Sequence, residues 1–275
     1  MGWSLRRLPV AWVRGLGAAL GWVWHSGVPI RRSIVRGNLA LAFPAWSRAQ
    51  VRSVARANFQ HYGRTLLEVV RAHSSAPSEG TMEGRAHLEG ALAEGRGVLL
   101  LTAHLGAFER LVRAPEVCGT RLWVVTRRFR VASAQGAWGA LRRGGAGLLP
   151  AGASARAALQ ALRRNEAVAF VLDQHDPSPK AVVAPFFGRP AATSRDLARL
   201  ARLTGAPVVP VFTWWDGQRH RLKALPAVAW DRQAAEADEA GTRACLAVVE
   251  QAIRQHPEQW LWLHRRWKVD QGAGS

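Results

Sequence analysis

A histidine and a glutamate follow an apolar run at a spacing that suits acid–base chemistry. Residues 97–102 read as a buried strand, His104 lies two residues beyond it, and Glu109 lies five residues further on. In open α/β sheets, groups that contact ligands gather just past the carboxyl ends of strands. Five residues of regular helix turn through about 140°, so His104 should lie in the turn and Glu109 in the first turn of a helix.

From that position the Glu109 carboxylate could reach back to the imidazole of His104. Such a carboxylate fixes the ring's tautomer and stabilises the imidazolium, which leaves Nε2 free to take a proton from a hydroxyl. Taken alone, this spacing also fits a histidine with a purely structural role.

Two later segments could contribute to the same site. Asp173 and Gln174 follow the apolar run 168–172, so the carboxylate could brace His104, bind substrate or serve the fold alone. Residues 186–193, which include Arg189, read as a tight turn into a helix capped by Thr193 or Ser194. The free amides of such a helix end suit a phosphate or an oxyanion, although a capped helix packed by two phenylalanines fits equally well.

The elements that must position these residues alternate along the chain. Ser47 can cap the first long helix, which has apolar residues at three- and four-residue intervals. Helices are expected at residues 47–73, 86–93, 107–113, 133–143, 154–164, 194–203 and 234–254, and strands at 97–102, 122–125, 168–172 and 208–212. Strands that are apolar on both faces and alternate with helices indicate an α/β fold with a mostly parallel or mixed sheet. We expect one main domain over residues 31–270, with a loop at 74–80.

The first 30 residues read as a separate, membrane-associating segment. Residues 8–24 are largely apolar, but Arg14 interrupts them, and an arginine in mid-span costs roughly 2.5 to 3.5 kcal/mol. No small-residue cleavage site follows, so the segment should be retained. An interfacial helix is favoured over a short tilted anchor, with Trp12, Trp22 and Trp24 at the lipid surface.

The composition indicates that the protein works next to an anionic, lipid-like surface. The 275 residues carry a formal net charge of +19, mostly from arginine, and this field would attract phosphates. The 13 tryptophans gather partly near the two ends of the chain, which favours a lipid surface over nucleic acid, although any one of them could be a core residue. Apolar residues make up 48% of the chain, which excludes a disordered protein, and two cysteines are too few for a disulfide framework or a zinc site.

Several enzyme classes lack their required motifs. The chain has no Gly-x-Ser-x-Gly elbow, no Walker loop, no His-Glu-x-x-His and no Cys-x-x-Cys. Serine hydrolases, P-loop nucleotide hydrolases and the common zinc enzymes are therefore disfavoured.

Four ordered blocks resemble one family, the late acyltransferases of lipid A biosynthesis within the wider group of glycerolipid acyltransferases. The blocks are RRSIVRGNLALAFP leading to FQHYGRTLLEV, GVLLLTAHLGAFE, VLDQHDPSPKAVVAPFFGRPAATSRDLARLARLTGAPVVPVF and PEQWLWLHRRWK. Together they cover most of residues 31–268. The family usually continues Asp-Gln-Asp where this chain has Asp173-Gln174-His175-Asp176, so the role of the second acid is open.

The resemblance implies direct acyl transfer without a metal or redox cofactor. His104, oriented by Glu109, would deprotonate a hydroxyl of a lipid A precursor, which attacks the thioester of an acyl carrier protein or acyl-CoA. Arg127 would bind a phosphate of the acceptor or of the donor's phosphopantetheine arm. Arg265 and Arg266 would clamp acidic headgroups, with a solvated basic face as the alternative. The family works at the cytoplasmic face of the inner membrane.

Two other functions fit the same residues. One is acyl transfer to another glycolipid, such as a phosphatidylinositol mannoside. The other is a non-catalytic protein that binds anionic lipid or nucleic acid, although no nucleic-acid partner is expected. Under the acyltransferase hypothesis, changing His104 or Glu109 to alanine should abolish transfer and leave folding intact.

Overall fold

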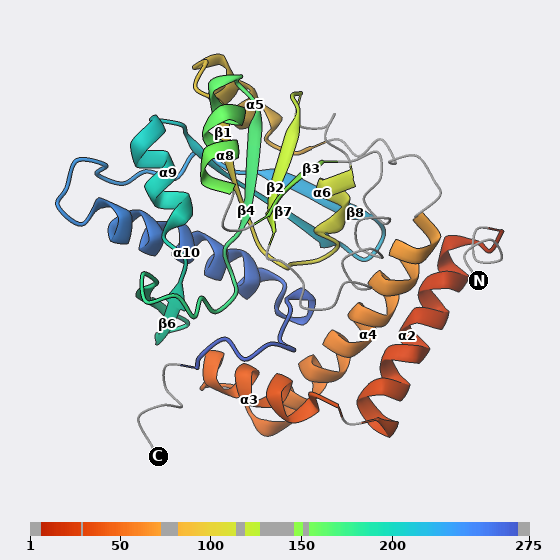
Figure 1. The fold of residues 1–275 in the computed structure, drawn as a ribbon. Coiled ribbons are helices and arrows are strands. Elements are labelled where there is room, and N and C mark those ends of the chain that lie inside the picture. Colours follow the sequence, from red (N-terminus) through yellow and green to blue (C-terminus); the bar gives the residue numbers. More distant parts are fainter. Residues whose placement is uncertain are drawn as a thin grey trace.

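The computed structural model describes residues 7–28, 30–72, 82–113, 119–126, 146–150 and 154–268. They form an α/β structure around a six-stranded sheet (Figure 1). In spatial order the strands are β3 (Gly147–Pro150), β2 (Leu122–Thr126), β4 (Ala167–Val171), β1 (Val98–Thr102), β7 (Val208–Trp215) and β8 (His220–Ala224). The helices are α2 (Val10–Gly27), α3 (Arg32–Ala42), α4 (Arg48–Ala72), α5 (Arg85–Ala93), α6 (Glu109–Arg113), α8 (Ser154–Arg163), α9 (Asp196–Thr204) and α10 (Ala237–Gln255), with a 3-10 turn η2 (Pro257–Gln259).

Five neighbouring strands run parallel, and β8 pairs antiparallel with β7 at one edge. The expected mostly parallel or mixed sheet is therefore confirmed. All five residues of β1 are buried, as expected for a central parallel strand covered on both faces.

Alternate residues of β1 enter two different cores. Leu99 and Leu101 belong to the larger core, together with buried side chains from α3, α4, α8, α9 and α10. Val98 and Leu100 belong to a smaller core with α5. Helices thus cover both faces of the sheet, and the carboxyl ends of its parallel strands meet at one edge.

The N-terminal helix α2 lies against α4 (Figure 1). The two helix backbones can touch because glycines lie at the contact. A Cβ on Gly63 would clash with the carbonyl oxygen of Gly17, at a distance of 2.0 Å. A Cβ on Gly21 would lie 2.2 Å from the carbonyl oxygen of Phe59. One face of α2 is therefore buried on the protein, and its opposite face is left exposed.

Arg14, which interrupts the apolar run, is satisfied within the protein. It forms an ion pair with Glu68 of α4, and its guanidinium carbon lies 3.3 Å from the ring centre of Trp215. His220 Nε2 contacts the second oxygen of Glu68 at 2.7 Å. Within the described ranges, no helix has the length and apolar character needed to cross a bilayer.

The start of α4 confirms Ser47 as its cap. The Gln50 N–H donates to Ser47 Oγ at 3.2 Å, and the Ser47 N–H donates to Gln50 Oε1 at 2.8 Å. This reciprocal pair is a capping box.

The segment at 186–193 differs from expectation. It forms the turn and second strand of a hairpin, β5 (Val182–Phe186) with β6 (Arg189–Thr193), and the expected helix, α9, begins at Asp196. Of the two predicted cap residues, Ser194 accepts a hydrogen bond from the Asp196 N–H through its Oγ at 3.3 Å. Thr193 is instead fully buried in β6. The expected helix at 133–143 and loop at 74–80 lie outside the described residues.

Candidate active site

His104 and Asp173 are brought together by equal offsets from two paired strands. In the parallel register of β1 and β4, Thr102 faces Val171. His104 lies two residues past Thr102, and Asp173 lies two residues past Val171. Both side chains therefore emerge at the same edge of the sheet, side by side.

The hydrogen bonds at His104 define its tautomer. Nδ1 lies 2.9 Å from Asp173 Oδ1, and the His104 backbone N–H donates to Asp173 Oδ2 at 3.0 Å. A carboxylate can only accept, so Nδ1 carries the hydrogen and Nε2 of the neutral ring carries the lone pair. The Phe108 ring lies edge-on at 4.7 Å between centroids, which further fixes the imidazole plane.

Asp173 is fully buried and is held as a carboxylate. Burial alone raises its pKa, but the charge and hydrogen bond of His104, the nearby His264 and the indole N–H of Trp260 outweigh burial and lower the pKa. Its Oδ2 accepts from Trp260 Nε1 at 2.6 Å. A buried carboxylate with several donors suits the task of steadying an imidazolium.

The structure thus places Asp173 against His104 Nδ1, whereas the sequence interpretation gave the orienting role to Glu109, and that role of Glu109 stays a prediction. Glu109 begins α6 and is half-buried. Burial raises the pKa of the Tyr62 hydroxyl, and the charges of Asp173 and Glu109 raise it further. Both carboxylates thus act on one buried hydroxyl, which places Glu109 close to the same site.

The C-terminal segment forms the wall behind Asp173. Leu105 and Trp260 form an antiparallel bridge, and the Leu261 N–H donates to the carbonyl of His104 at 3.1 Å. Gly106 follows with φ of 60°, and a Cβ there would lie 2.3 Å from the carbonyl oxygen of Thr213. Only glycine fits this turn, which follows His104 and fixes the direction of its backbone.

Two asparagines from the N-terminal helices hold that wall in place. Asn58 Nδ2 donates to the carbonyls of Glu258 and Trp260, each at 2.8 Å. Asn38 Nδ2 donates to the carbonyls of Trp262 and His264, also at 2.8 Å. Helices α3 and α4 are therefore part of the site's support.

Gln174 contacts the reactive side of the histidine. Its Nε2 lies 3.4 Å from His104 Nε2, a long contact to the nitrogen that bears the lone pair. An incoming hydroxyl would have to displace this amide or share the position with it.

The arginine at 266 has a structural role. Arg266 is fully buried. Its Nη1 donates to the carbonyl of Ala192 at 2.7 Å, and its Nη2 donates to Thr193 Oγ1 at 2.6 Å. Its guanidinium lies over the Phe186 ring at 5.1 Å. The predicted headgroup role of Arg266 is wrong, because its charge faces the core, and Thr193 serves as its partner there.

The remaining predicted site residues lie in different places. Trp12 and Trp22 are 72% and 51% exposed, but Trp24 packs inward on Phe59 at 4.9 Å between ring centres. Arg189 is exposed in β6, and Arg265 is exposed beside the site. Arg127 lies outside the described residues, so its role stays a prediction.

Comparison with known proteins decides the family. The family of bacterial lipid A biosynthesis acyltransferases matches residues 1–269 of the chain. The chain belongs to this family.

Members of this family and one more distant enzyme are similar over most of their lengths. The lipid A biosynthesis lauroyltransferase of Escherichia coli is 30% identical over 97% of this chain and 89% of its own. The palmitoleoyltransferase of the same organism is 28% identical over 97% of this chain and 88% of its own. The phosphatidylinositol mannoside acyltransferase of Mycobacterium tuberculosis is 26% identical over 86% of this chain and 77% of its own.

The contact of Trp260 with Asp173 leads to a first expected result in this lipid A acyltransferase family member. Trp260→Phe keeps the packed ring but removes one N–H from Asp173 Oδ2. We expect kcat to fall about 10- to 150-fold, since a lost hydrogen bond to a charged group costs roughly 1.5–3 kcal/mol. More negative charge then faces the imidazole, which holds its proton to higher pH, so the acidic limb of kcat/KM should move upward.

Trp262→Phe is the matched control. It also removes a buried indole N–H, but that group donates to the carbonyl of Pro257 and not to Asp173. Its pH–rate profile should stay in place. Equal profiles for the two variants would show that Trp260 contributes packing alone.

Proposed function

We propose that this protein transfers a fatty acyl group from a carrier thioester to a hydroxyl of a lipid A precursor, with His104 as general base. The donor is an acyl carrier protein or acyl-CoA. The pairing of His104 Nδ1 with the buried, ionised Asp173 carries the proposal, because it leaves Nε2 as the base. Family membership supplies the class of reaction.

The transfer balances with these residues alone. His104 Nε2 takes the proton of the acceptor hydroxyl as its oxygen attacks the thioester carbonyl carbon. Asp173 stabilises the imidazolium that forms. The tetrahedral intermediate then expels the thiolate, which takes the proton from the imidazolium, so the products are an ester and a free thiol.

Glu109 and Arg127 keep proposed roles beside this pair. Glu109 adds negative charge near the imidazolium, consistent with its effect on Tyr62. Arg127 would neutralise a substrate phosphate or the developing oxyanion.

An assay of the purified protein tests the function. Labelled acyl carrier protein and acyl-CoA donors of graded chain length are offered with a panel of acceptors that includes a lipid A precursor and a phosphatidylinositol mannoside. Transfer to the lipid A precursor is expected. Transfer to the mannoside alone would favour the activity named for the mycobacterial relative. An unchanged lipid A acyl pattern in a deletion strain, read by mass spectrometry, would also contradict the proposal.

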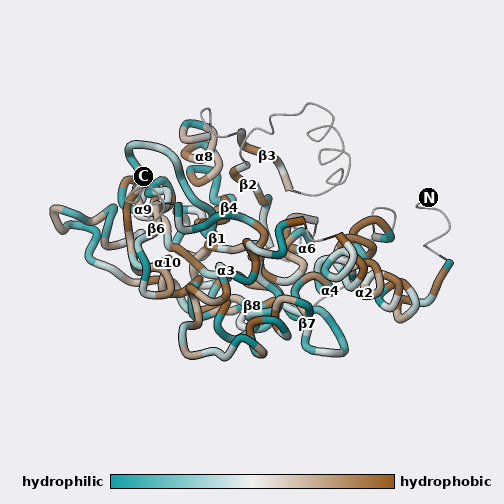
Figure 2. The backbone as a smooth tube through the Cα atoms, turned by 90° about the horizontal axis from the view of Figure 1, so that it is seen from below, coloured by the Kyte–Doolittle hydropathy of each residue, from teal (hydrophilic) through white to brown (hydrophobic). Residues whose placement is uncertain are grey.

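The outer face of α2 suits a membrane surface. Trp12, Leu16, Leu20 and Val23 recur at helical spacing and are 72%, 47%, 48% and 49% exposed. Figure 2 colours much of α2 as hydrophobic. An exposed apolar stripe on a helix that is fixed to a basic protein favours binding in the plane of an anionic membrane. The proposed location is the cytoplasmic face of the inner membrane.

Removing this stripe gives a second expected result. The double variant Trp12→Ser/Leu20→Ser should bind vesicles of anionic phospholipid about 100-fold more weakly, since each large apolar side chain contributes roughly 1.5–3 kcal/mol when buried. Vesicle co-sedimentation measures this. Leu203→Ser/Val183→Ser changes two side chains of similar exposure, 59% and 52%, away from α2 and should bind as the wild type does. Equal loss in both variants would remove the stripe's assigned role.

A further inference from the structure

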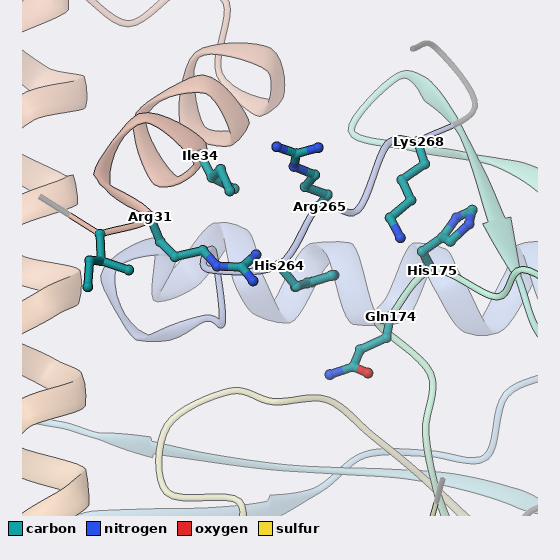
Figure 3. A pocket seen from close by; sticks show the side chains of 8 residues that line it. Arg31, Ile34, Gln174, His175, His264, Arg265 and Lys268 are labelled. Carbon is teal, nitrogen blue, oxygen red and sulfur yellow. The ribbon is translucent and has the colours of Figure 1, made fainter. Parts of the chain in front are cut away.

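A basic cavity of about 640 Å³ opens beside the catalytic histidine. It is formed where three segments meet, the start of α3, the loop after β4 and the C-terminal segment that follows η2 (Figure 3). Its lining residues are Ile30, Arg31, Ile34, Gln174, His175, His264, Arg265 and Lys268.

The charge of this cavity has one sign. Arg31, Arg265 and Lys268 are exposed at its rim, and Figure 3 shows their charged groups around one open space. Among the described residues, no carboxylate lines the cavity or forms an ion pair with these three cations. Burial lowers the pKa of His264 to about 4, so that ring is neutral at pH 7. Three cations around one cavity suit an anionic group such as a phosphate.

The cavity adjoins His104 through the side chain of Gln174. Gln174 lines it, and the Gln174 amide nitrogen lies 3.4 Å from His104 Nε2. A ligand group seated among the cations would therefore belong to a molecule whose hydroxyl can reach the base.

One wall of the cavity is apolar and leads toward the membrane-facing stripe. Ile30 and Ile34 line it, and Ile30 is 63% exposed. Val28, 46% exposed, follows the end of α2, whose outer face carries the exposed apolar side chains. A ligand with a charged head and hydrocarbon tails would place the head among the cations and direct the tails along these residues.

We infer that this cavity binds a phosphate group of the lipid acceptor and thereby positions the acceptor's hydroxyl at His104. The ligand class is a phosphorylated acyl-sugar. The inference rests on the proposed function for the identity of the acceptor, but the phosphate site itself rests on the cavity. The donor's phosphopantetheine arm carries the same chemistry, and the apolar wall favours the lipid over it.

Binding measurements test the site apart from turnover. In a His104→Ala background, the phosphorylated acyl-disaccharide acceptor and the same lipid after phosphatase treatment are titrated in detergent micelles by calorimetry. Arg265→Gln/Lys268→Gln should weaken binding of the phosphorylated lipid roughly 10- to 100-fold. The dephosphorylated lipid should bind both proteins alike. Equal binding of the phosphorylated lipid to both proteins would overturn the inference, even if acyl transfer itself is confirmed.

Steady-state kinetics on the enzyme that retains His104 show whether the cavity binds the acceptor or the donor. The cavity variant should raise KM for the phosphorylated acceptor by a similar factor and leave KM for the acyl donor unchanged. A rise in donor KM alone would overturn the inference. Arg163→Gln/Arg199→Gln removes the same charge from exposed sites on α8 and α9, and should change neither constant. If no acceptor is acylated, the proposed function fails, while the titration still decides the phosphate site.

Discussion

Replacing Asp173 by asparagine should lower kcat for acyl transfer by about 10³- to 10⁴-fold, as for the loss of the orienting acid in other His–Asp pairs. Two donors fix the new amide, because the His104 N–H and the Trp260 Nε1–H both point at Oδ2. The amide oxygen must stay with them, so its NH₂ faces His104 Nδ1. The ring then takes the tautomer with hydrogen on Nε2 and loses its base.

The same variant should remain folded, because asparagine matches aspartate in shape and keeps both contacts to Oδ2. Circular dichroism and the urea midpoint check this, and His104→Ala sets the floor for activity. Glu109→Gln separates the two acids. If it loses as much activity as His104→Ala while Asp173→Asn retains a substantial rate, Asp173 is not the acid that matters.

The position of the site could be predicted from the sequence because strand ends are visible there. The apolar runs 97–102 and 168–172 predicted the strands β1 and β4, which end two residues before His104 and Asp173. Their parallel pairing aligns the two ends, and the sequence does not reveal which strands are neighbours. The orienting role was therefore predicted for Glu109, the carboxylate nearer in sequence, while the strand pairing places Asp173 against His104 Nδ1.

The support of the site was harder to predict, since it comes from side chains far away in the chain. Asn58 appears in a helical pattern as one more position on a buried face, yet its amide holds the backbone of Trp260 some 200 residues later. Arg266 looks like a surface cation beside tryptophans, but its guanidinium fits the carbonyl of Ala192 and the hydroxyl of Thr193. Local sequence carries no signal for such pairings.

Two of the missed strands, at the edges of the six-stranded sheet, differ in composition from a buried strand. β3 has four residues and ends in Pro150, and β8 carries His220, Arg221 and Lys223 at the sheet edge. Edge strands tolerate such residues because one side of their backbone needs no partner strand. The central strands were found because both of their faces are apolar.

Lowering the pH from 6.5 to 4 should destabilise the fold through two buried histidines. Burial lowers the pKa of both His61 and His264 from 6.5 to about 4, and the partial opposing effects of the Gly106 backbone on His61 and of Asp173 on His264 do not compensate. In this window the unfolded chain binds protons that the folded chain cannot, so stability is present above pH 6.5 and is lost as pH falls. Each ring contributes about 1.4 kcal/mol per pH unit, or roughly 3 kcal/mol over the window.

Together the two rings account for roughly 6 kcal/mol, comparable with the whole stability of many domains. Urea unfolding at pH 7, 6 and 5 measures the slope. His264→Asn, whose amide can replace the Nδ1–H donor to the Leu261 carbonyl, and His61→Gln should each remove about half of it. Exposed His87→Gln should leave the slope unchanged. A slope that survives in both buried-site variants would mean that these rings are reached by water and accept protons while the protein is folded.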